Sequence, residues 1–481
     1  MNPDNSAGRP REGRMSFPNV VRCARDLFAR SATASFRHVW RVLRSTARAW
    51  SGLRPTQQVV VGFVIYAFLG TLTLGLPWSQ KADAPWLDHV FIATSALSTT
   101  GLTTISIADS YTFVGQFVVL VLFQIGGIGY MTLSSIIILA RRKSLTSAQT
   151  GLLRAGFSLP HYFIPQRFLL HVVVFTILIE FTGSLVLWWR FSCLGVSDPL
   201  WSAVFHAVSA FATAGFSLNN NSLEAFADDA IVQLTIGSLS MFGAVGFIVM
   251  QDVWYSIRLR ERMLTFTSRI ILLFSSVILG AFTLFIYFVE PAVRSLPIDE
   301  RMLASFFQAM TASTTAGFNT VPIAGLGKAT LVVMMVVMII GASPSGTGGG
   351  IKTTSVSALL AVMLSGLRGR TAIALLKHEI PMQRVVNAVA AATVYICLLV
   401  VGLMLLCLSE RQEFLSLVFE AVSAIGTVGL SMGATSDLSI TGKCIIVSLM
   451  FAGRCGPLTI GLALLQREDA LKNLRRDDLA V

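Results

Sequence analysis

The sequence predicts an all-α polytopic membrane protein with four parallel membrane–pore-loop–membrane repeats. Eight transmembrane helices and four re-entrant pore helices are expected around one pseudo-fourfold pore. Three observations lead to this fold class: an apolar composition, an alternation of basic and acidic segments, and a short motif that occurs four times. Of the 481 residues, 54% are hydrophobic and 13% are charged, and the mean hydropathy is +0.70. Such a chain is too apolar for an ordinary soluble protein.

Several apolar segments are long enough to cross a bilayer, for which a helix needs about 20 residues. Nearly charge-free runs occupy residues 59–76, 112–140, 168–189, 229–250, 266–289, 385–408 and 441–453, and a further run begins at residue 329. Residues 1–55 are rich in arginine and contain no apolar core of the kind that a signal peptide needs, so no signal peptide is expected.

The net charge of +12 is distributed unevenly along the chain. Basic residues cluster at 9–54, 141–143, 258–262, 368–370 and 475–476, and acidic residues gather between these clusters. Because positively charged loops stay in the cytoplasm, the alternation predicts cytoplasmic termini and an even number of crossings. The excess of basic residues is therefore explained by the orientation of the chain in the membrane, and no nucleic-acid partner is expected.

The repeated motif reads FIATSALSTTGLT at 91–103, FHAVSAFATAGFS at 205–217, FQAMTASTTAGFN at 307–319 and FEAVSAIGTVGLS at 419–431. Counted back from the aligned glycine, each copy has Thr at two residues, Ala at five and eight, Ser or Thr at six, and Phe at ten. Faces of small residues for helix packing would explain the Gly and Ala but not this fourfold register. Internal repeats of this kind set the architecture.

Each copy lies between two apolar spans, on the acidic and therefore outer side. The residues before the Thr are sufficient for a helix of roughly 16 Å, about half a membrane. The Thr-x-Gly that follows leaves non-helical backbone at membrane depth, which is tolerated only where it is buried in protein or lines a water-filled cavity. Four such loops on one axis predict a ring of carbonyl oxygens, which can replace the hydration shell of a cation. The C-terminal ends of the short helices also favour a cation there.

The repeats divide the chain and define the candidate filter. The expected parts are a basic N-terminal region (1–55), repeat 1 (56–145), repeat 2 (146–262), repeat 3 (263–370), repeat 4 (371–466) and a C-terminal tail (467–481). The filter candidates are Thr99, Thr100, Gly101 and Leu102; Thr213, Ala214, Gly215 and Phe216; Thr315, Ala316, Gly317 and Phe318; and Thr427, Val428, Gly429 and Leu430.

The second span of repeat 3 is interrupted. It is apolar over 329–340, breaks at GASPSGTGGG (341–350) and resumes at 356–364. This stretch lacks the spacing of a phosphate-binding loop, and no strand precedes it. The equivalent positions elsewhere are short: 126–129, 243–246 and 453–456. Polar, flexible backbone at mid-membrane must face the pore, and a simple helix kink is the alternative.

A few polar residues lie at membrane depth. Arg454 is inside an apolar span, where a charge is costly and normally functional; snorkelling to an interface is the alternative. Glu180 is mid-span, and the sequence does not indicate its partner. Glu420, His206 and Gln308 occupy one register of the pore helices. They either brace the filter through hydrogen bonds or face the outer vestibule.

These motifs resemble the Trk/Ktr/HKT superfamily of potassium transporters, over roughly residues 55–465. The resemblance rests on the filter sequences STTGLT, ATAGFS, TTAGFN and GTVGLS and on GASPSGTGGGIKTTS at 341–355. It implies K+ uptake across the cytoplasmic membrane through a channel-like pore, with K+ held at the filter residues. Gly101 implies a preference for K+, because a serine there accompanies Na+ permeation in the superfamily. No extra pair of spans precedes residue 59, so the chain is similar to the shorter Ktr type.

The resemblance also implies an intramembrane gate in loop 341–352. An arginine of the last span, matching Arg454, is expected to point into the cavity and contact this loop, and Lys352 is expected at the cytoplasmic mouth. The gate candidates are Gly341, Ser343, Pro344, Gly346, Gly348, Gly349, Gly350, Lys352 and Arg454.

The partners that the resemblance implies are a second copy of the chain, as a homodimer, and a separate cytosolic ring of KtrA-like nucleotide-binding subunits that responds to ATP and ADP. No covalent cofactor is expected on this chain. The expected docking face comprises Arg141, Arg142, Lys143, Arg154, Arg258, Arg260, Arg262, Arg368, Arg370 and Arg475, with the C-terminal tail. Residues 36–50 read as a basic amphipathic helix suited to anionic inner-leaflet lipid; a flexible basic tail is the alternative.

Other classes of function fit less well. A secondary transporter would show inverted repeats and an ionisable site at the midplane, whereas these repeats run parallel. A less selective Na+/K+ pathway, or an ion-coupled secondary cation transporter, is the alternative function. The six His and six Cys show no metal-like spacing, so no enzymatic activity is expected.

Overall fold

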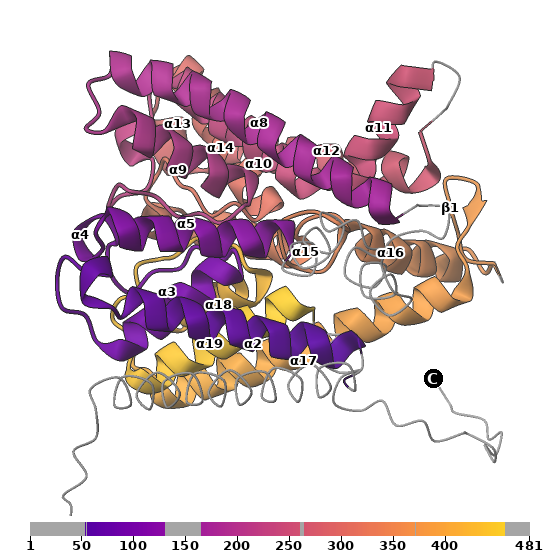
Figure 1. Ribbon diagram of the computed structural model, residues 1–481. Coiled ribbons are helices and arrows are strands. Elements are labelled where there is room, and N and C mark those ends of the chain that lie inside the picture. The colour runs from indigo at the N-terminus through magenta and orange to yellow at the C-terminus, as the bar shows by residue number, and fades with distance from the viewer. Residues whose placement is uncertain (1–52, 54, 130–164, 260–263, 371, 457–481) are drawn as a thin grey trace, which may run out of the picture. The chain divides into compact units, whose positions relative to one another are not determined.

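The computed structural model describes residues 53, 55–129, 165–259, 264–370 and 372–456 (Figure 1). The expected amphipathic helix near the N-terminus, the basic cluster at 141–143 and the C-terminal tail lie outside this part. The described chain is mainly helical. It departs from an all-helical fold in one small hairpin, in which β1 (Ala374–Leu375) pairs antiparallel with β2 (His378–Glu379).

Each quarter of the chain contains a long first span helix, a short helix and a second span helix, in that order (Figure 1). The first span helices are α2 (Pro55–Leu74), α8 (Pro165–Cys193), α12 (Phe266–Val289) and α17 (Met382–Ser409). The short helices are α3 (Trp86–Leu97), α9 (Pro199–Phe211), α14 (Ile298–Thr314) and α18 (Phe414–Gly426). The second span helices are α5 (Phe113–Ile128), α10 (Ala230–Val245), α15 (Lys328–Ile340) and α19 (Ile440–Cys455).

Smaller elements connect these helices. The connecting elements are η1 (Pro77–Ser79), α4 (Ile107–Ser110), η2 (Glu224–Phe226), α13 (Pro291–Arg294) and η3 (Ile323–Gly325). Two further helices follow second span helices directly: α11 (Phe247–Leu259) follows α10, and α16 (Thr353–Leu367) follows the loop after α15.

Among the described residues, four helices are long and apolar enough to cross a membrane, and they are the four first span helices. They match the apolar runs of the sequence closely, and their outward faces carry exposed apolar side chains such as Phe68, Ile177 and Val277. The pair α10 and α11 passes the same test together, although the two helices are bent by 94°. The second span helices alone have 13 to 16 residues, which is short for a hydrocarbon core of about 30 Å.

Every second span helix ends at a glycine with positive φ. The residues are Gly129 (φ 85°), Gly246 (φ 92°), Gly341 (φ 64°) and Gly456 (φ 84°). The uninterrupted apolar run 229–250 predicts one helix, and the structure instead has two that meet at Gly246. The helix breaks therefore recur at equivalent positions, while repeat 3 alone inserts a long loop among the described residues.

The quarters pack on one another in a closed order. The second span helix of each quarter contacts the short helix of the next: α5 contacts α9, α10 contacts α14, α15 contacts α18, and α19 contacts α3. The fourth quarter thus returns to the first.

The phenylalanine that opens each motif explains part of this packing. Phe91, Phe205, Phe307 and Phe419 are all fully buried. Phe205 lies in the apolar cluster of the first quarter, Phe307 in that of the second and Phe419 in that of the third. Phe91 lies in the cluster of the fourth quarter. Each motif therefore places an aromatic ring in the core of the preceding repeat.

Candidate functional site

The four short helices end in the same way. Each is followed by a threonine in the left-handed region, with φ between 48° and 55°: Thr99, Thr213, Thr315 and Thr427. The next residue donates its N–H to the carbonyl five residues earlier, at 2.8 to 3.0 Å in all four copies. A β-branched residue with positive φ is uncommon, and such conformations persist where the surrounding structure holds them, often at functional sites.

The Ser or Thr six residues before each glycine fastens the end of the helix in three repeats. Ser95 Oγ donates to the carbonyl of Leu102 at 2.7 Å, and Ser209 Oγ donates to the carbonyl of Phe216 at 2.9 Å. In repeat 4 the serine at this position, Ser423, accepts from the Gly429 N–H at 3.1 Å. The polar position in the motif therefore holds the Thr-x-Gly segment against its own helix.

The four Thr-x-Gly segments (99–102, 213–216, 315–318 and 427–430) meet one another through their glycines. A methyl group built on each glycine would approach the carbonyl oxygen of the next segment, and the fourth would approach the first. The distance from the added methyl carbon to the carbonyl oxygen is 2.4 Å for Gly101 and Ala214, and 2.9 Å for Gly215 and Ala316. It is 2.3 Å for Gly317 and Val428, and 2.0 Å for Gly429 and Thr100. Because only glycine permits this approach at positive φ, the motif glycine is the residue that lets four backbones converge.

Glu420 braces the segment of repeat 4. Its side chain is fully buried. The carboxylate accepts from Ser431 Oγ and Thr435 Oγ1, each at 2.6 Å, and from the Met432 N–H at 3.0 Å. The backbone just beyond the Thr-x-Gly segment is thereby tied to the short helix.

His206 and Gln308 occupy the same register and have the same role. His206 Nε2 is 3.0 Å from Ser217 Oγ. With its amide oriented so that both ends are satisfied, the Gln308 side-chain oxygen accepts from the N–H groups of Thr320 and Val321, at 3.1 and 3.0 Å. Both side chains are fully buried. The sequence left open whether they brace the filter or face the outer vestibule, and the structure supports bracing.

The loop 341–352 lies against all four left-handed threonines. The carbonyl of Thr347 accepts from Thr99 Oγ1 at 3.3 Å, and Thr347 Oγ1 is 3.1 Å from Thr213 Oγ1. The Gly349 N–H donates to Thr315 Oγ1 at 3.2 Å, and a methyl group on Gly349 would lie 2.2 Å from Thr427 Oγ1. One segment of repeat 3 therefore touches the equivalent residue of every repeat.

The glycines at the two ends of the loop allow these ends to cross. The Ala342 N–H donates to the carbonyl of Gly349 at 3.0 Å. A methyl group on Gly341 would lie 2.3 Å from that same oxygen, and one on Gly350 would lie 2.7 Å from the Cα of Gly341. The crossing keeps the loop compact between α15 and α16.

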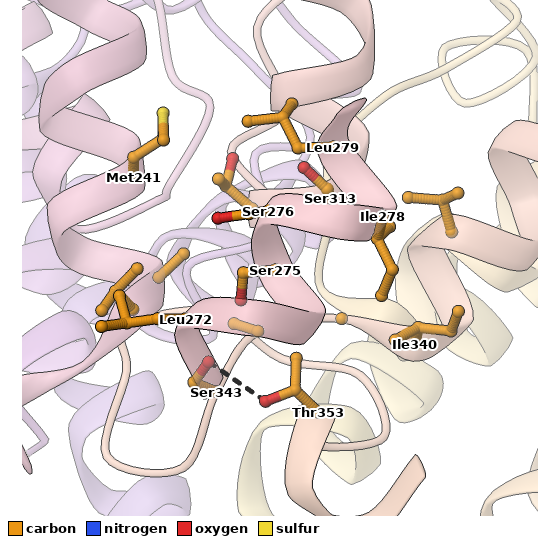
Figure 2. Close-up of a pocket in the computed structure, with 16 residues that line it drawn as sticks. Met241, Leu272, Ser275, Ser276, Ile278, Leu279, Ser313, Ile340, Ser343 and Thr353 are labelled. Atoms are coloured by element: carbon orange, nitrogen blue, oxygen red, sulfur yellow. Dashed lines mark hydrogen bonds between the residues drawn. The ribbon is translucent and has the colours of Figure 1, made fainter. Parts of the chain in front are cut away.

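Lys352 and Ser343 stabilise the loop internally. Lys352 Nζ donates to the carbonyl of Gly348 at 2.6 Å, so the side chain folds back onto the loop. Ser343 Oγ accepts from Thr353 Oγ1, at the start of α16, at 3.1 Å (Figure 2). Pro344 and Gly346, which the sequence also predicts as gate residues, lie against the junction of α10 and α11.

Arg454, in the last turn of α19, joins the loop to repeat 1. One of its terminal nitrogens donates to the carbonyl of Thr347, and the other donates to the carbonyl of Gly126 in α5. The two salt bridges within the described residues involve other cations. The guanidinium is therefore held by neutral carbonyls, and its positive charge remains uncompensated by direct carboxylate contact in this part of the chain.

A cavity of about 100 Å³ lies beside the loop (Figure 2). It is bordered by α10, α12, α14, α15 and the first residues of the loop. Hydroxyl groups from Ser275, Ser313 and Ser343 lie among mainly apolar side chains. The loop thus has space on the side that faces repeats 2 and 3.

Glu180 has a partner in the structure. Gln124 Nε2 in α5 donates to Glu180 Oε2 in α8 at 2.9 Å. The contact links the first two repeats within the membrane region and lies apart from the four Thr-x-Gly segments.

A salt bridge joins repeat 4 to repeat 1 near the N-terminal ends of α19 and α3. Lys443 Nζ in α19 lies 2.6 Å from Asp88 Oδ1 in α3, and the side chains are 16% and 4% exposed. The chain connects the other pairs of neighbouring repeats covalently, so this pair lies at the junction that depends entirely on noncovalent contacts.

We expect Asp88→Asn to lower the midpoint of thermal unfolding in detergent, because Lys443 would keep a largely buried charge without its counter-charge. Breaking such a pair costs on the order of 3 kcal/mol. The double variant Asp88→Lys/Lys443→Asp should recover most of the loss. An unfolding midpoint that the single change leaves unaltered would contradict the role of the pair.

The loops that follow the Thr-x-Gly segments of repeats 1 and 2 are also joined. Asn220 Nδ2 donates to Asp109 Oδ2 at 2.9 Å, and Ser106 Oγ donates to Asn220 Oδ1 at 2.6 Å. The hydrogen bond from Asn220 is the main cause that lowers the pKa of Asp109 below its ordinary value. The carboxylate therefore stays charged, and keeps these bonds, well below neutral pH.

Comparison with known proteins identifies the family. A family model named TrkH and described as a cation transport protein matches residues 31–470. The chain belongs to this family. The Ktr system potassium uptake protein B of Bacillus subtilis is 33% identical over 436 residues, which cover 89% of this chain and 96% of that protein. The potassium/sodium uptake protein NtpJ of Enterococcus hirae is 31% identical, with 86% of this chain and 93% of that protein covered.

The fold has a solved counterpart in the same family. The crystal structure of the potassium transporter TrkH from Vibrio parahaemolyticus matches with a TM-score of 0.69 over 85% of this chain and 84% of that one, at 20% identity. The family model and the relatives together confirm the resemblance to the Trk and Ktr potassium transporters. TrkH-family membership and the long apolar helices identify a multi-pass membrane protein, and the relatives are named as transport proteins.

Sequence reasoning missed two residues of the loop and one salt bridge between repeats. Thr347 and Ser345 are absent from the predicted gate residues, and Asp88 and Lys443 were not predicted as a pair. The hydroxyl groups of the loop were a usable signal, because a polar side chain in a glycine-rich break at membrane depth needs a partner. The salt bridge had no such signal, since its members are 355 positions apart.

Proposed function

We propose that this chain takes up K+ across the cytoplasmic membrane through a channel-like pore. The observation that carries the proposal is the closed series of contacts between the glycine of one Thr-x-Gly segment and the carbonyl of the next. Four backbone segments so arranged can surround a cation with carbonyl oxygens, which substitute for its hydration shell. The K+ ion is the cargo, bound in passing at the four segments.

The pore is formed by eight transmembrane helices and four re-entrant pore helices around a pseudo-fourfold axis. The closed order of contacts between second span helices and short helices supports this arrangement. The short helices direct their C-terminal ends, which carry partial negative charge, toward the Thr-x-Gly segments, which also favours a cation. Both termini lie in the cytoplasm.

The filter prefers K+ to Na+. Glycine at the first filter position, Gly101, supports this preference through the resemblance to the superfamily. A less selective Na+/K+ pathway is the second candidate, because one relative of similar identity is named for both ions.

The loop 341–352 and Arg454 form the gate. The loop contacts the threonines of all four repeats, so an ion leaving the filter on the inner side would meet it. The uncompensated charge of Arg454, bonded to the carbonyl of Thr347, adds an electrostatic barrier to a cation at the same level.

Regulation comes from a cytosolic partner. Relatives are named as parts of a Ktr system, which supports a homodimer docked on a nucleotide-binding ring that responds to ATP and ADP. Arg258, Arg368 and Arg370 are the described members of the proposed docking face. The basic N-terminal region contacts anionic inner-leaflet lipid.

The test is reconstitution of the purified chain into liposomes, with K+ or Na+ influx measured under an imposed inside-negative potential. We expect K+ influx clearly faster than Na+ influx and above that of protein-free liposomes. Equal K+ and Na+ influx would favour the less selective pathway. K+ influx that requires a second ion on the same side would favour coupled transport.

A further inference from the structure

The first half of the gate loop is fastened to repeat 2. The Ser343 N–H donates to the carbonyl of Ala244, and the Thr347 N–H donates to that of Gly243, both at 3.1 Å. Thr347 Oγ1 also donates to the carbonyl of Phe211, the last residue of α9, at 3.1 Å. The loop is therefore bonded to the junction of α10 and α11, which we call the elbow (residues 243–248).

Ser345 caps α11 from a distance. The first N–H groups of a helix have no partner within the helix, and a side chain just before it usually accepts one of them. Here the preceding residue is Gly246, which has no side chain. Ser345 Oγ accepts from the Ile248 N–H at 3.0 Å, and the Ser345 carbonyl accepts from the Phe247 N–H at 3.4 Å.

The backbone conformation of Ser345 and the packing around it suit this role. Ser345 has φ 60° and is 8% exposed, so it is held in a region that serine seldom adopts. A methyl group on Gly246 would lie 2.7 Å from the carbonyl oxygen of Pro344, and one on Gly346 would lie 2.5 Å from that of Ala244. The elbow and the loop interlock without room for side chains between them.

The remainder of α11 extends away from this junction. Phe247, Ile248 and Val249 are no more than 2% exposed, whereas Trp254 is 44% and Ile257 is 70% exposed. The first turn of α11 is thus fixed to the loop, Asp252 in its middle accepts from the Thr265 N–H at 2.7 Å, and its last turns are accessible. The cavity of Figure 2 borders both Ala244 and Ser343, so a shift at the elbow has space beside it.

We propose that α11 is a lever that sets the position of the gate loop, and that Ser345 is the positioning residue that couples the two. A tilt of α11 that separates Ile248 from Ser345 would release residues 343–347, and with them the Thr347 contacts to Thr99 and Thr213. This inference rests on the proposed gate function of the loop.

The variants that test it are Ser345→Ala, which removes the acceptor, and Ser345→Asn, which keeps an acceptor in a residue that tolerates positive φ. Thr265→Ala is the matched control, because the Thr265 hydroxyl caps the neighbouring helix α12 by accepting from the Ser268 N–H and has no hydrogen bond to the loop. The Thr265 N–H, which donates to Asp252 of α11 at 2.7 Å, is retained in this variant. We expect K+ influx to rise about fivefold in Ser345→Ala, the factor that corresponds to one lost cap. Influx should stay near wild type in the other two variants.

Hydrogen–deuterium exchange of the peptide that spans the elbow gives a second readout, which does not depend on transport. We expect about fivefold faster exchange there in Ser345→Ala, and no such increase in Ser345→Asn or Thr265→Ala. Unchanged exchange in Ser345→Ala would overturn the capping role. Faster exchange with unchanged K+ influx, in a chain whose wild type conducts, would overturn the lever.

The pattern of failure separates this inference from the proposed function. If K+ influx with wild type and with every variant is no faster than in protein-free liposomes, the proposed function is wrong. The proposal that α11 is a lever is then wrong as well. If wild type conducts but Ser345→Asn raises influx and elbow exchange as much as Ser345→Ala, the proposed function stands and the coupling through Ser345 is wrong.

Discussion

Gly429→Ala should abolish K+-selective influx. The added methyl group would lie 2.0 Å from the carbonyl oxygen of Thr100, closer than at any of the other three motif glycines. The φ of 93° also disfavours any residue with a side chain. Either the Thr100 carbonyl turns away or repeats 4 and 1 separate, and both changes open the proposed carbonyl ring. The measurement is K+ and Na+ influx in liposomes, per folded protein recovered.

The same chain supplies a graded series and a control. Gly215→Ala should reduce K+-selective influx less than Gly429→Ala. The methyl group added at Gly215 would lie 2.9 Å from the carbonyl oxygen of Ala316, and the φ of Gly215 is 69°. Gly433→Ala is the matched control, since Gly433 has the same φ of 93° but no heavy atom within 4 Å of the added methyl group. If Gly429→Ala conducts with the K+ preference of Gly433→Ala, the filter assignment is wrong.

Arg454→Gln should raise K+ influx by at least about tenfold. The change removes a positive charge and the paired donors that hold Thr347 and Gly126. Hydrogen bonds to charged groups contribute about 1.5–3 kcal/mol each, so losing even one would shift the equilibrium of the loop by roughly a factor of ten or more. Influx should be measured at several K+ concentrations, to separate a faster maximal rate from a changed affinity.

Arg301→Gln is the control for this substitution. Arg301 also donates to a backbone carbonyl, that of Tyr287, and its guanidinium lies 4.0 Å from the centre of the Tyr287 ring. It has no contact with the gate loop among its hydrogen bonds. This variant can lose stability but should keep wild-type influx per folded protein. Wild-type kinetics in Arg454→Gln would exclude a role for Arg454 in the gate.

The first span helices could be predicted from the sequence to within four residues at each end. The apolar run 266–289 coincides with α12 (Phe266–Val289), and 385–408 lies within α17 (Met382–Ser409). An uninterrupted apolar segment flanked by polar residues is a local signal, and lipid requires a helix there. The pattern of glycines likewise identified the four Thr-x-Gly segments, because the register repeats four times.

The break at Gly246 could not be predicted in the same way. The run 229–250 carries no charge after Asp229, and the helix ends at Gly246, which has a φ of 92° and packs against Pro344 and Gly346 of the loop. Ser345 and Thr347 acquire their roles through partners 97 and 134 positions away. Such contacts arise only when the four repeats are assembled. A hydroxyl group in a glycine-rich break indicates that a partner is needed, but the local sequence does not indicate which residue it is.

Four identical subunits around an axis must repeat every feature four times. The loop of repeat 3 touches all four left-handed threonines at once, and a symmetric tetramer would have to fit four such loops in that space. Joining the quarters in one gene removes this restriction. One quarter can then carry the loop of the proposed gate, and another can carry the arginine that is bonded to this loop. The position after the first phenylalanine of each motif can likewise differ, as Glu420, His206, Gln308 or Ile92. A single mutation in a fused chain also changes one quarter of the pore, so ion preference can drift in small steps that an assembly of identical subunits cannot take.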